Sequence, residues 1–386
     1  MKAKYLILFL SLLFCLIVNV RADDSLEKFP EWILKEKIRG GFLFARTDAK
    51  YVNDTKYAGI IRSNGLNTVI ATGDIHVKGS FDSTLRQYRR WAQTAKKEKL
   101  HLFISYCWQP SESYSYRRVV YSDGTVGPAP CARDSQYWQN YLIHLGKVIA
   151  ELSLEPNSQV DGVFLDCELY YSESNKRSYG RQACFCDNCF SSFLFTKGYS
   201  GEQLPLVEYR QRENWLKEKG LLDEYFIFLE KDVEGLARKY EQELHRINPS
   251  FLIGMYPTIP SDWVLKAIAR GFGTEQFPLI HFATDSYYKG GYTRVPDKPE
   301  ELYKKSGINS LYIAGFTLRS YSSNKLELNL SEAAKKCSGY WLFMMPMLWQ
   351  PPSKYHKLAS GTQQEYWQAI KKANDDIDVL ILKKSP

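Results

Sequence analysis

The stretch DGVFLDCELYY, residues 161–171, is an apolar run that ends in two carboxylates one residue apart. Successive side chains of a β-strand point to opposite faces, so residues two apart share a face. Phe164, Asp166 and Glu168 would therefore line one side of a strand. At a rise of roughly 3.3 Å per residue, the Cα atoms of Asp166 and Glu168 would lie roughly 6.6 Å apart. Acidic side chains are rarely buried without a partner, so this strand end needs either an ion pair or a chemical role.

The same unit, a short apolar run followed by a helical pattern, occurs eight times along the chain. The predicted strands are Gly41–Ala45, Thr68–Thr72, His101–Cys107, Gly162–Glu168, Phe251–Tyr256, Leu279–Thr284, Leu311–Thr317 and Tyr340–Met345. The predicted helices are about Lys56–Asn64, Ser83–Glu98, Gln136–Leu152, Leu222–Ile247, Asp262–Arg270, Pro299–Lys305, Ser331–Lys336 and Gln363–Ala373. Strands that are apolar almost throughout and alternate with helices indicate a parallel sheet covered by helices.

Eight such units in 386 residues predict an α/β fold, a (β/α)₈ barrel, with a long insertion after strand four at about residues 169–221. An open, doubly wound sheet is the alternative. No Gly-x-Gly-x-x-Gly fingerprint follows the first strand, which argues against a dinucleotide-binding version of that sheet.

The first residues have the pattern of a secretory signal. Lys2 and Lys4 precede an apolar run over residues 5–18, and Val20-Arg21-Ala22 fits a signal-peptidase site. We predict cleavage near Ala22, a catalytic domain over residues 23–386, and a secreted or periplasmic location with no membrane attachment after cleavage. A retained anchor is the alternative, although the run is short for a bilayer span.

The composition argues against a nucleic-acid partner and is compatible with a carbohydrate partner, although large cores also use aromatic residues. The formal net charge is +8, and no Lys/Arg-rich block concentrates it, so the basic stripe of a nucleic-acid-binding protein is missing. Aromatic residues make up 15% of the chain, which suits surfaces that stack on sugar rings. The expected partner is an oligo- or polysaccharide; the sequence does not predict an oligomeric state.

Candidate site residues follow from the strand ends, because such barrels gather their chemistry at the C-terminal ends of the strands. The catalytic candidates are Asp166, Glu168 and Asp285. The substrate-binding candidates are Arg46, Asp74, Trp108, Tyr256, Tyr287 and Trp349. A purely structural role is the alternative for each candidate. The carboxylates could form ion pairs, and the substrate-binding candidates could pack against one another at the barrel opening.

The chemistry of these residues favours glycosidic cleavage. Six scattered histidines do not supply the converging ligands of a metal-dependent barrel hydrolase. Glycoside hydrolysis can proceed on two carboxylates without a cofactor, one ionised and one holding a proton. We therefore expect no cofactor for catalysis.

The segment DGVFLDCE, residues 161–168, resembles the fourth-strand signature of glycoside hydrolase family 18, the chitinases, which reads Asp-Gly-x-Asp-x-Asp-x-Glu. Asp161, Gly162, Asp166 and Glu168 match, whereas Phe164 replaces the first inward Asp. The resemblance implies that Glu168 is the general acid and that Asp166 orients the substrate acetamide. A second likeness, to the α-galactosidase clan, would make Asp166 the nucleophile and Asp285 the acid.

The segment CFCDNC, with Cys184, Cys186 and Cys189, is similar to the cysteine cluster of family 42 β-galactosidases and related uncharacterised barrels. That resemblance implies a structural zinc, with Cys131 or Cys107 as the fourth ligand. Disulfides are the competing interpretation, because they are the default in an oxidising compartment. Seven cysteines remain after signal removal, an odd number that cannot pair fully within one chain.

Together these patterns predict a secreted glycoside hydrolase that cleaves O-glycosidic bonds at the mouth of the barrel. The alternative of a different class is a non-catalytic, lectin-like barrel derived from a glycosidase fold. A transglycosylase is a third possibility, which product analysis would distinguish.

Overall fold

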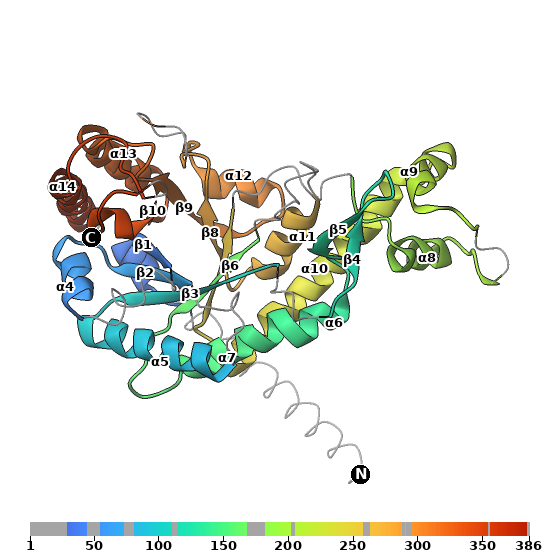
Figure 1. The fold of residues 1–386 in the computed structure, drawn as a ribbon, viewed down its shortest axis with the longest axis horizontal. Helices are drawn as coiled ribbons and strands as arrows, with labels where there is room; N and C mark the ends of the chain where they lie inside the picture. Colours follow the sequence, from blue (N-terminus) through green and yellow to red (C-terminus); the bar gives the residue numbers. More distant parts are fainter. Residues whose placement is uncertain are drawn as a thin grey trace, which may run out of the picture.

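The protein folds around a closed barrel of eight parallel strands (Figure 1). The computed structural model describes residues 29–44, 55–72, 81–109, 115–167, 182–201, 205–257, 263–287, 290, 295–353 and 356–383. The barrel strands are β1 (Ile38–Phe44), β2 (Thr68–Thr72), β3 (His101–Cys107), β6 (Gly162–Asp166), β7 (Leu252–Tyr256), β8 (Leu279–Ala283), β9 (Ser310–Thr317) and β10 (Gly339–Phe343). Pairing of β1 with β10 closes the ring, and the predicted (β/α)₈ barrel is confirmed.

Helices cover the outside of the ring, as the alternating pattern predicts. They are α4 (Thr55–Ser63), α5 (Phe81–Glu98), α6 (Ser135–Tyr137), η2 (Trp138–Ile143), α7 (His144–Leu152), α10 (Leu222–Ile247), α11 (Trp263–Phe272), α12 (Pro299–Lys305), α13 (Ser323–Lys336), η4 (Met345–Leu348) and α14 (Gln363–Leu382). In α5 the buried side chains Tyr88, Trp91, Ala92 and Ala95 recur at helical spacing and face the strands. Helices α13 and α14 are longer than the predicted Ser331–Lys336 and Gln363–Ala373.

The barrel interior is packed with large side chains. Alternate strand residues point inward and form one cluster, whose buried members include Phe42, Phe103, Phe164, Phe282 and Trp341. The other residues of each strand face the helices, as Val163 and Leu165 do on β6. Alternate residues of each strand therefore face the interior and the helices in turn, because successive side chains of a strand point to opposite faces.

A short helix, α2 (Trp32–Glu36), closes the end of the barrel at which the strands begin. Its buried Ile33 joins the interior cluster, and Trp32 stacks on His101 with ring centroids 3.4 Å apart. The carboxylate of Asp161 lies at the same end, where it accepts a hydrogen bond from the Leu102 amide at 2.9 Å. The first residue of the DGVFLDCE motif thus fixes strand register, at the opposite end of β6 from Asp166.

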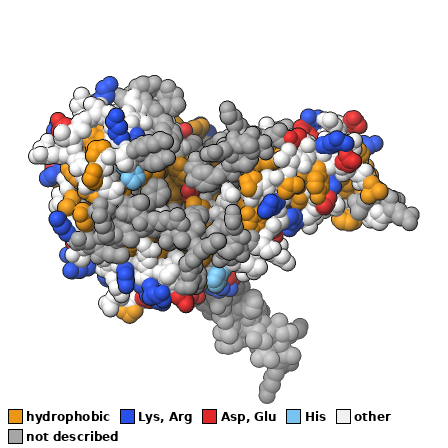
Figure 2. Space-filling model, in the orientation of Figure 1, with side chains coloured by type: hydrophobic (Ala, Val, Ile, Leu, Met, Phe, Trp, Pro, Cys, Tyr) orange, Lys and Arg blue, Asp and Glu red, His pale blue; other side chains and the backbone are white. Residues whose placement is uncertain are grey.

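An arm projects from one side of the barrel (Figure 1). It contains the antiparallel pair β4 (Arg118–Val120) and β5 (Val126–Pro130), together with α8 (Asp187–Thr196) and α9 (Tyr209–Glu218). Helices α8 and α9 belong to the predicted insertion after the fourth barrel strand. The β4–β5 hairpin follows β3 and was not predicted, because its two strands are short. The outer end of the arm carries both acidic and basic side chains (Figure 2).

The predicted signal peptide, residues 1–22, lies outside the described residues. In the part of the chain that the structure describes, no helix is long and apolar enough to cross a membrane.

One buried ionisable side chain couples the fold to pH. His281 on β8 is fully buried on the helix-facing side of the barrel, with the rings of Tyr303 and Tyr312 packed edge-on against it. Burial lowers the pKa of His281 to about 3, and the Pro257 backbone opposes that shift. The folded state therefore takes up this proton only at a far lower pH than the unfolded chain, where the pKa is about 6.5.

We predict that the free energy of unfolding falls as the pH is lowered through this window. Between pH 7 and pH 5 the His281 contribution should fall by about 2 kcal/mol, because the unfolded state gains a proton that the folded state excludes. Urea unfolding of His281→Leu should show a correspondingly smaller loss than the parent. His144→Gln, an exposed histidine on α7, is the control. Equal losses in the parent and His281→Leu would contradict the prediction.

Candidate active site and cysteine cluster

Three neighbouring barrel strands end in a row of polar side chains. Cys107 of β3, Asp166 of β6 and Tyr256 of β7 occupy matched register positions across the sheet. Asp166 lies on the same strand face as Phe164, whose ring belongs to the barrel interior. It is partly exposed, whereas the rest of β6 is buried. The predicted catalytic carboxylate therefore lies at the rim of the barrel interior.

A thiol contacts that carboxylate. The Sγ atom of Cys107 donates to Oδ2 of Asp166 at 3.7 Å. The backbone holds this rim in place beyond the strands, because the Trp108 amide donates to the Asp166 carbonyl at 2.6 Å. The Cys167 amide likewise donates to the Tyr256 carbonyl at 2.7 Å. Asp166 is thus set on a rigid element, as a catalytic group requires.

Aromatic rings form the floor beneath Asp166. Tyr256 stacks on Phe164, with centroids 5.6 Å apart, and lies edge-on to Trp341 at 5.7 Å. Tyr287 packs against Trp341 at 5.4 Å and against Phe343 at 5.5 Å. Tyr256 and Phe343 are partly exposed, so the floor offers apolar ring surface next to a carboxylate.

Trp341 is held rigidly within this floor. Its indole Nε1 donates to the Ala283 carbonyl at 3.2 Å. Gly315 on the adjacent strand β9 leaves room for the indole, because a Cβ there would lie 2.7 Å from Nε1. The glycine is required by this close approach, since such a contact is shorter than van der Waals packing permits.

Asp285, the third catalytic candidate, lies in a different environment. Its carboxylate accepts a hydrogen bond from the hydroxyl of Tyr312. The Tyr312 ring is fully buried in the layer between strands and helices, not in the barrel interior. Burial, followed by the charge of Asp285, raises the pKa of Tyr312, so the phenol remains a donor. Asp285 thus contacts a residue of the helical layer, whereas Asp166 shares the inward face of β6 with Phe164.

The remaining candidates are distributed between the mouth and the helical layer. Tyr256 and Tyr287 belong to the aromatic floor. Trp108 is fully buried in the outer layer, against Tyr137 and Trp138. Trp349 stacks on Trp367 of α14 and contacts Tyr57 of α4. Both tryptophans thus pack helices in this structure. Arg46, Asp74 and Glu168 lie outside the described residues.

Three residues of the mouth were not predicted as catalytic or substrate-binding residues: Trp341, Phe343 and Cys107, which was named only as a possible zinc ligand. The alternation of side chains along each strand could have identified all three as inward-facing residues. Trp341 and Phe343 alternate within the eighth predicted strand, and Cys107 is the last inward position of the third. Recognising them requires the register between strands, because only the register shows which strand ends meet.

The four cysteines named as possible metal ligands come together on the arm. The sulfur atoms of Cys131, Cys184, Cys186 and Cys189 all lie within 4.8 Å of one another and are buried. Cys131 follows β5, and Cys189 lies in the first turn of α8, so the cluster joins the two insertions. Cys131 is the fourth member, whereas Cys107, the other candidate, lies at the barrel mouth.

These sulfur positions fit a tetrahedral metal. A zinc–sulfur bond of ~2.3 Å places tetrahedral ligand sulfurs roughly 3.8 Å apart. The Cys131–Cys189 distance is 3.5 Å and the Cys131–Cys186 distance is 3.9 Å. All seven cysteines of the described chain are free thiols. Hydrogen bonds from Cys131, Cys184 and Cys189 lower the pKa of Cys186. In the same cluster, hydrogen bonds with the other cysteines raise the pKa of Cys131, and burial raises the pKa of Cys184.

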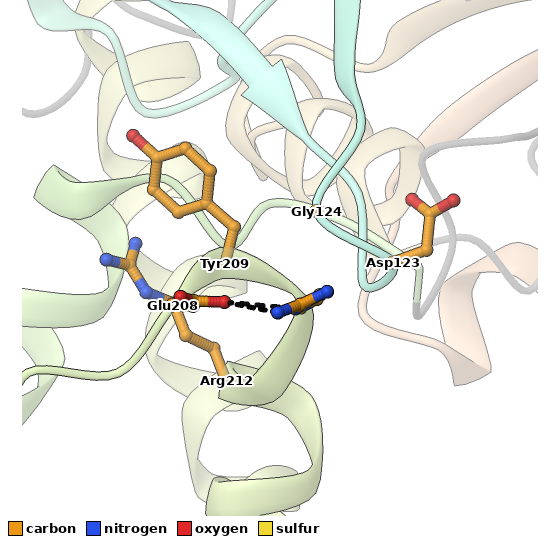
Figure 3. Close-up of a pocket in the computed structure, with 6 residues that line it drawn as sticks. Asp123, Gly124, Glu208, Tyr209 and Arg212 are labelled. Carbon is orange, nitrogen blue, oxygen red and sulfur yellow. Dashed lines mark hydrogen bonds and ion pairs between the residues drawn. The ribbon is translucent and has the colours of Figure 1, made fainter.

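A surface cavity of about 450 Å³ lies between the β4–β5 turn and the start of α9 (Figure 3). Asp123, Glu208 and Tyr209 are among its lining residues. The side chain of Arg210 pairs with Glu208 at 3.0 Å, and that of Arg212 is bound by Asp187 at 2.6 Å. The Arg210 and Arg212 side chains at the cavity are thus already held in ion pairs.

Two solved structures, of a β-amylase and a β-galactosidase, have a similar fold. The catalytic domain of a β-amylase from Paenibacillus polymyxa matches with a TM-score of 0.58 at 12% identity, over 91% of this chain and 99% of that one. A β-galactosidase from the psychrophilic Marinomonas ef1 matches with a TM-score of 0.57 at 11% identity, over 89% of this chain and 60% of that one. At such identities the likeness shows the fold alone, a (β/α)₈ barrel.

No protein-family model matches the sequence, and no curated protein matches it either. The resemblances to glycoside hydrolase families 18 and 42 are therefore not confirmed, and they rest on the motif residues alone.

The mouth makes a direct prediction about thiol reactivity. Cys107 is partly exposed, whereas the other six cysteines of the described chain are buried. A thiol reagent such as Ellman's reagent should therefore modify one thiol per native chain rapidly, and Cys107→Ala should remove this fast phase. Peptide mapping after brief alkylation identifies the modified residue. A fast phase that persists in Cys107→Ala would show that another cysteine is accessible.

Proposed function

We propose that the protein is a secreted glycoside hydrolase that cleaves O-glycosidic bonds of an oligo- or polysaccharide. The observation that carries this proposal is the position of Asp166, a partly exposed carboxylate at the inner rim of the barrel above an aromatic floor. Sugar rings present apolar faces that stack on aromatic side chains, and glycosidic cleavage needs carboxylates beside the scissile bond. The glycosidase-like fold is consistent with this chemistry.

Glu168 is the proposed general acid and base, and Asp166 its partner. Asp166 is ionised in this proposal: it orients a substrate group or stabilises positive charge at the anomeric carbon. Glu168 holds the proton that the leaving oxygen receives. A negative charge nearby and apolar surroundings both favour the protonated form of a carboxyl, which is what an acid needs near neutral pH.

A Glu168→Gln protein tests the assignment. The amide keeps the size of the side chain but cannot transfer a proton, so hydrolysis should fall about 10²–10⁴-fold, the usual contribution of a general acid. The measurement is kcat on the aryl glycoside that the parent hydrolyses fastest among a panel. An aryl glycoside with a more acidic leaving group should be less affected, because it needs less protonation.

Two further variants serve as controls for this assignment. Asp166→Asn should also lose activity, whereas Asp285→Asn should keep most of it if Asp285 serves mainly to bind Tyr312. Parental activity in Glu168→Gln would exclude Glu168 as the acid. A parent that binds oligosaccharides but hydrolyses none, with no new linkage formed, would instead identify a lectin-like barrel.

We also propose that Cys131, Cys184, Cys186 and Cys189 hold a structural zinc. Four thiolates leave no open coordination position, so the metal would supply no catalysis and would instead fix the β4–β5 hairpin to α8. The metal would thus stabilise the packing of the arm.

Removing one ligand should release the metal and loosen the arm. The parent should contain about one zinc per chain, and Cys189→Ser should contain well below one, with a lower melting temperature, because metal binding contributes directly to folding. Metal analysis by mass spectrometry and differential scanning calorimetry measure the two effects. Cys337→Ser, which removes a buried thiol outside the cluster, is the control. A metal-free parent with two disulfides would refute the zinc.

A further inference from the structure

Two arginines flank the cysteine cluster, and each has one buried guanidinium nitrogen without a hydrogen-bond partner among the described residues. The side chain of Arg133 is only 10% exposed and donates through Nε to Asp232 at 2.9 Å. Its guanidinium also lies over the ring of Phe228, 4.4 Å from the centroid. The remaining nitrogen, Nη1, is buried and has no hydrogen-bond partner among the described residues.

Arg117 approaches the cluster from the hairpin. Its carbonyl accepts a hydrogen bond from the Cys131 amide at 2.6 Å, so the two residues face each other across the hairpin. Asp134 binds the Arg117 amide at 2.6 Å and one guanidinium nitrogen at 3.4 Å. The Nη1 atom of Arg117 is also buried without a partner in the described part of the chain.

Contacts from two elements place both arginines next to the cluster. Arg117 precedes Arg118, which pairs with Pro130 across the hairpin, and Cys131 directly follows Pro130. Arg133 follows Cys131 by two residues, and its guanidinium packs on Phe228 of α10, the helix whose Tyr225 hydroxyl donates to the Cys184 carbonyl. Each arginine therefore lies beside a residue of the cluster.

We propose that Arg117 and Arg133 are positioning residues for the metal: their free Nη1–H groups donate to the thiolates and offset the charge of the loaded site. This inference rests on the proposed zinc. A divalent cation with four thiolates has a net charge of about −2, and burying such a charge without counter-charge is costly. The Val120 amide, which donates to Cys184 at 3.4 Å, adds one neutral hydrogen bond to the same sulfur shell.

Disulfides in the same place would leave these guanidinium donors without a good hydrogen-bond acceptor. Disulfide sulfurs are uncharged and accept hydrogen bonds poorly, whereas a buried guanidinium nitrogen that lacks an acceptor costs free energy. Asp134 binds Arg117 and Asp232 binds Arg133 through other nitrogen atoms, and neither aspartate accepts a hydrogen bond from Nη1. The arginines thus distinguish between the two readings of the cluster in favour of the metal.

The test is the rate at which zinc leaves the full-length protein in the presence of a chromogenic chelator. In Arg117→Gln/Arg133→Gln, zinc release should be at least tenfold faster than in the parent, within the 10–100-fold range of outer-shell effects on metal affinity. In cobalt-substituted protein, the thiolate-to-metal charge-transfer band should also shift, because hydrogen bonds to sulfur stabilise its lone pairs. A purely structural role would leave that band unchanged.

Two matched variants separate this role from general loosening of the arm. Arg210→Gln removes an arginine of the same arm whose partner is the exposed Glu208, and it should release zinc at the parental rate. Asp232→Asn keeps Arg133 but weakens its ion pair, so it should release zinc more slowly than Arg133→Gln. Equal release from Asp232→Asn and Arg133→Gln would overturn the proposal. Parental release or an unshifted band in the double variant would also overturn it. A parent that binds neither zinc nor cobalt would overturn both the metal and the arginine role.

Discussion

Closure of the strand ring is the constraint on which the rest of the structure depends. Pairing of β1 with β10 gives every strand two neighbours and forces alternate side chains into a common interior. That interior has to be filled, and large rings such as Phe282 and Trp341 fill it only where the neighbouring strands carry glycine. A Cβ at Gly254 would lie 2.6 Å from the Phe282 ring. The pattern of glycines and aromatics is therefore one packing solution, and it leaves Asp166 at the rim.

The two insertions take their position from that ring, and they meet at the cysteine cluster and through main-chain hydrogen bonds such as that from Phe185 to Val120. They follow β3 and β6, which are neighbours in the sheet although their last residues are far apart in sequence. Adjacent strands bring the hairpin and α8 to the same side of the barrel (Figure 1). The same two strands end in Cys107 and Asp166. The arm and the candidate site thus begin at the ends of the same two barrel strands.

The sequence predicted the eight barrel strands to within a few residues because buried parallel strands are apolar along their whole length. It predicted Asp166 for the same reason, since a carboxylate at the end of such a strand breaks the pattern. It could not rank Trp108 against Trp341, because both are tryptophans near strand ends and only strand register and parity separate the helical layer from the interior. Nor could spacing choose between Cys131 and Cys107, since that choice depends on where the hairpin after β3 leads.

Phe164 has a physical consequence for the proposed chemistry. In the family 18 signature an acidic residue stands at this position, whereas here a phenyl ring lies beneath Asp166 and stacks on Tyr256. Without that lower carboxylate, no like charge at position 164 repels Asp166 from below, and the Cys107 thiol on the adjacent strand contacts the carboxylate from the side. A thiol donates only a weak hydrogen bond and carries no charge, so it contacts Asp166 without forming an ion pair with it. The described part of the site is thus a single carboxylate, Asp166, at the barrel rim above an apolar floor, with no second acid at position 164.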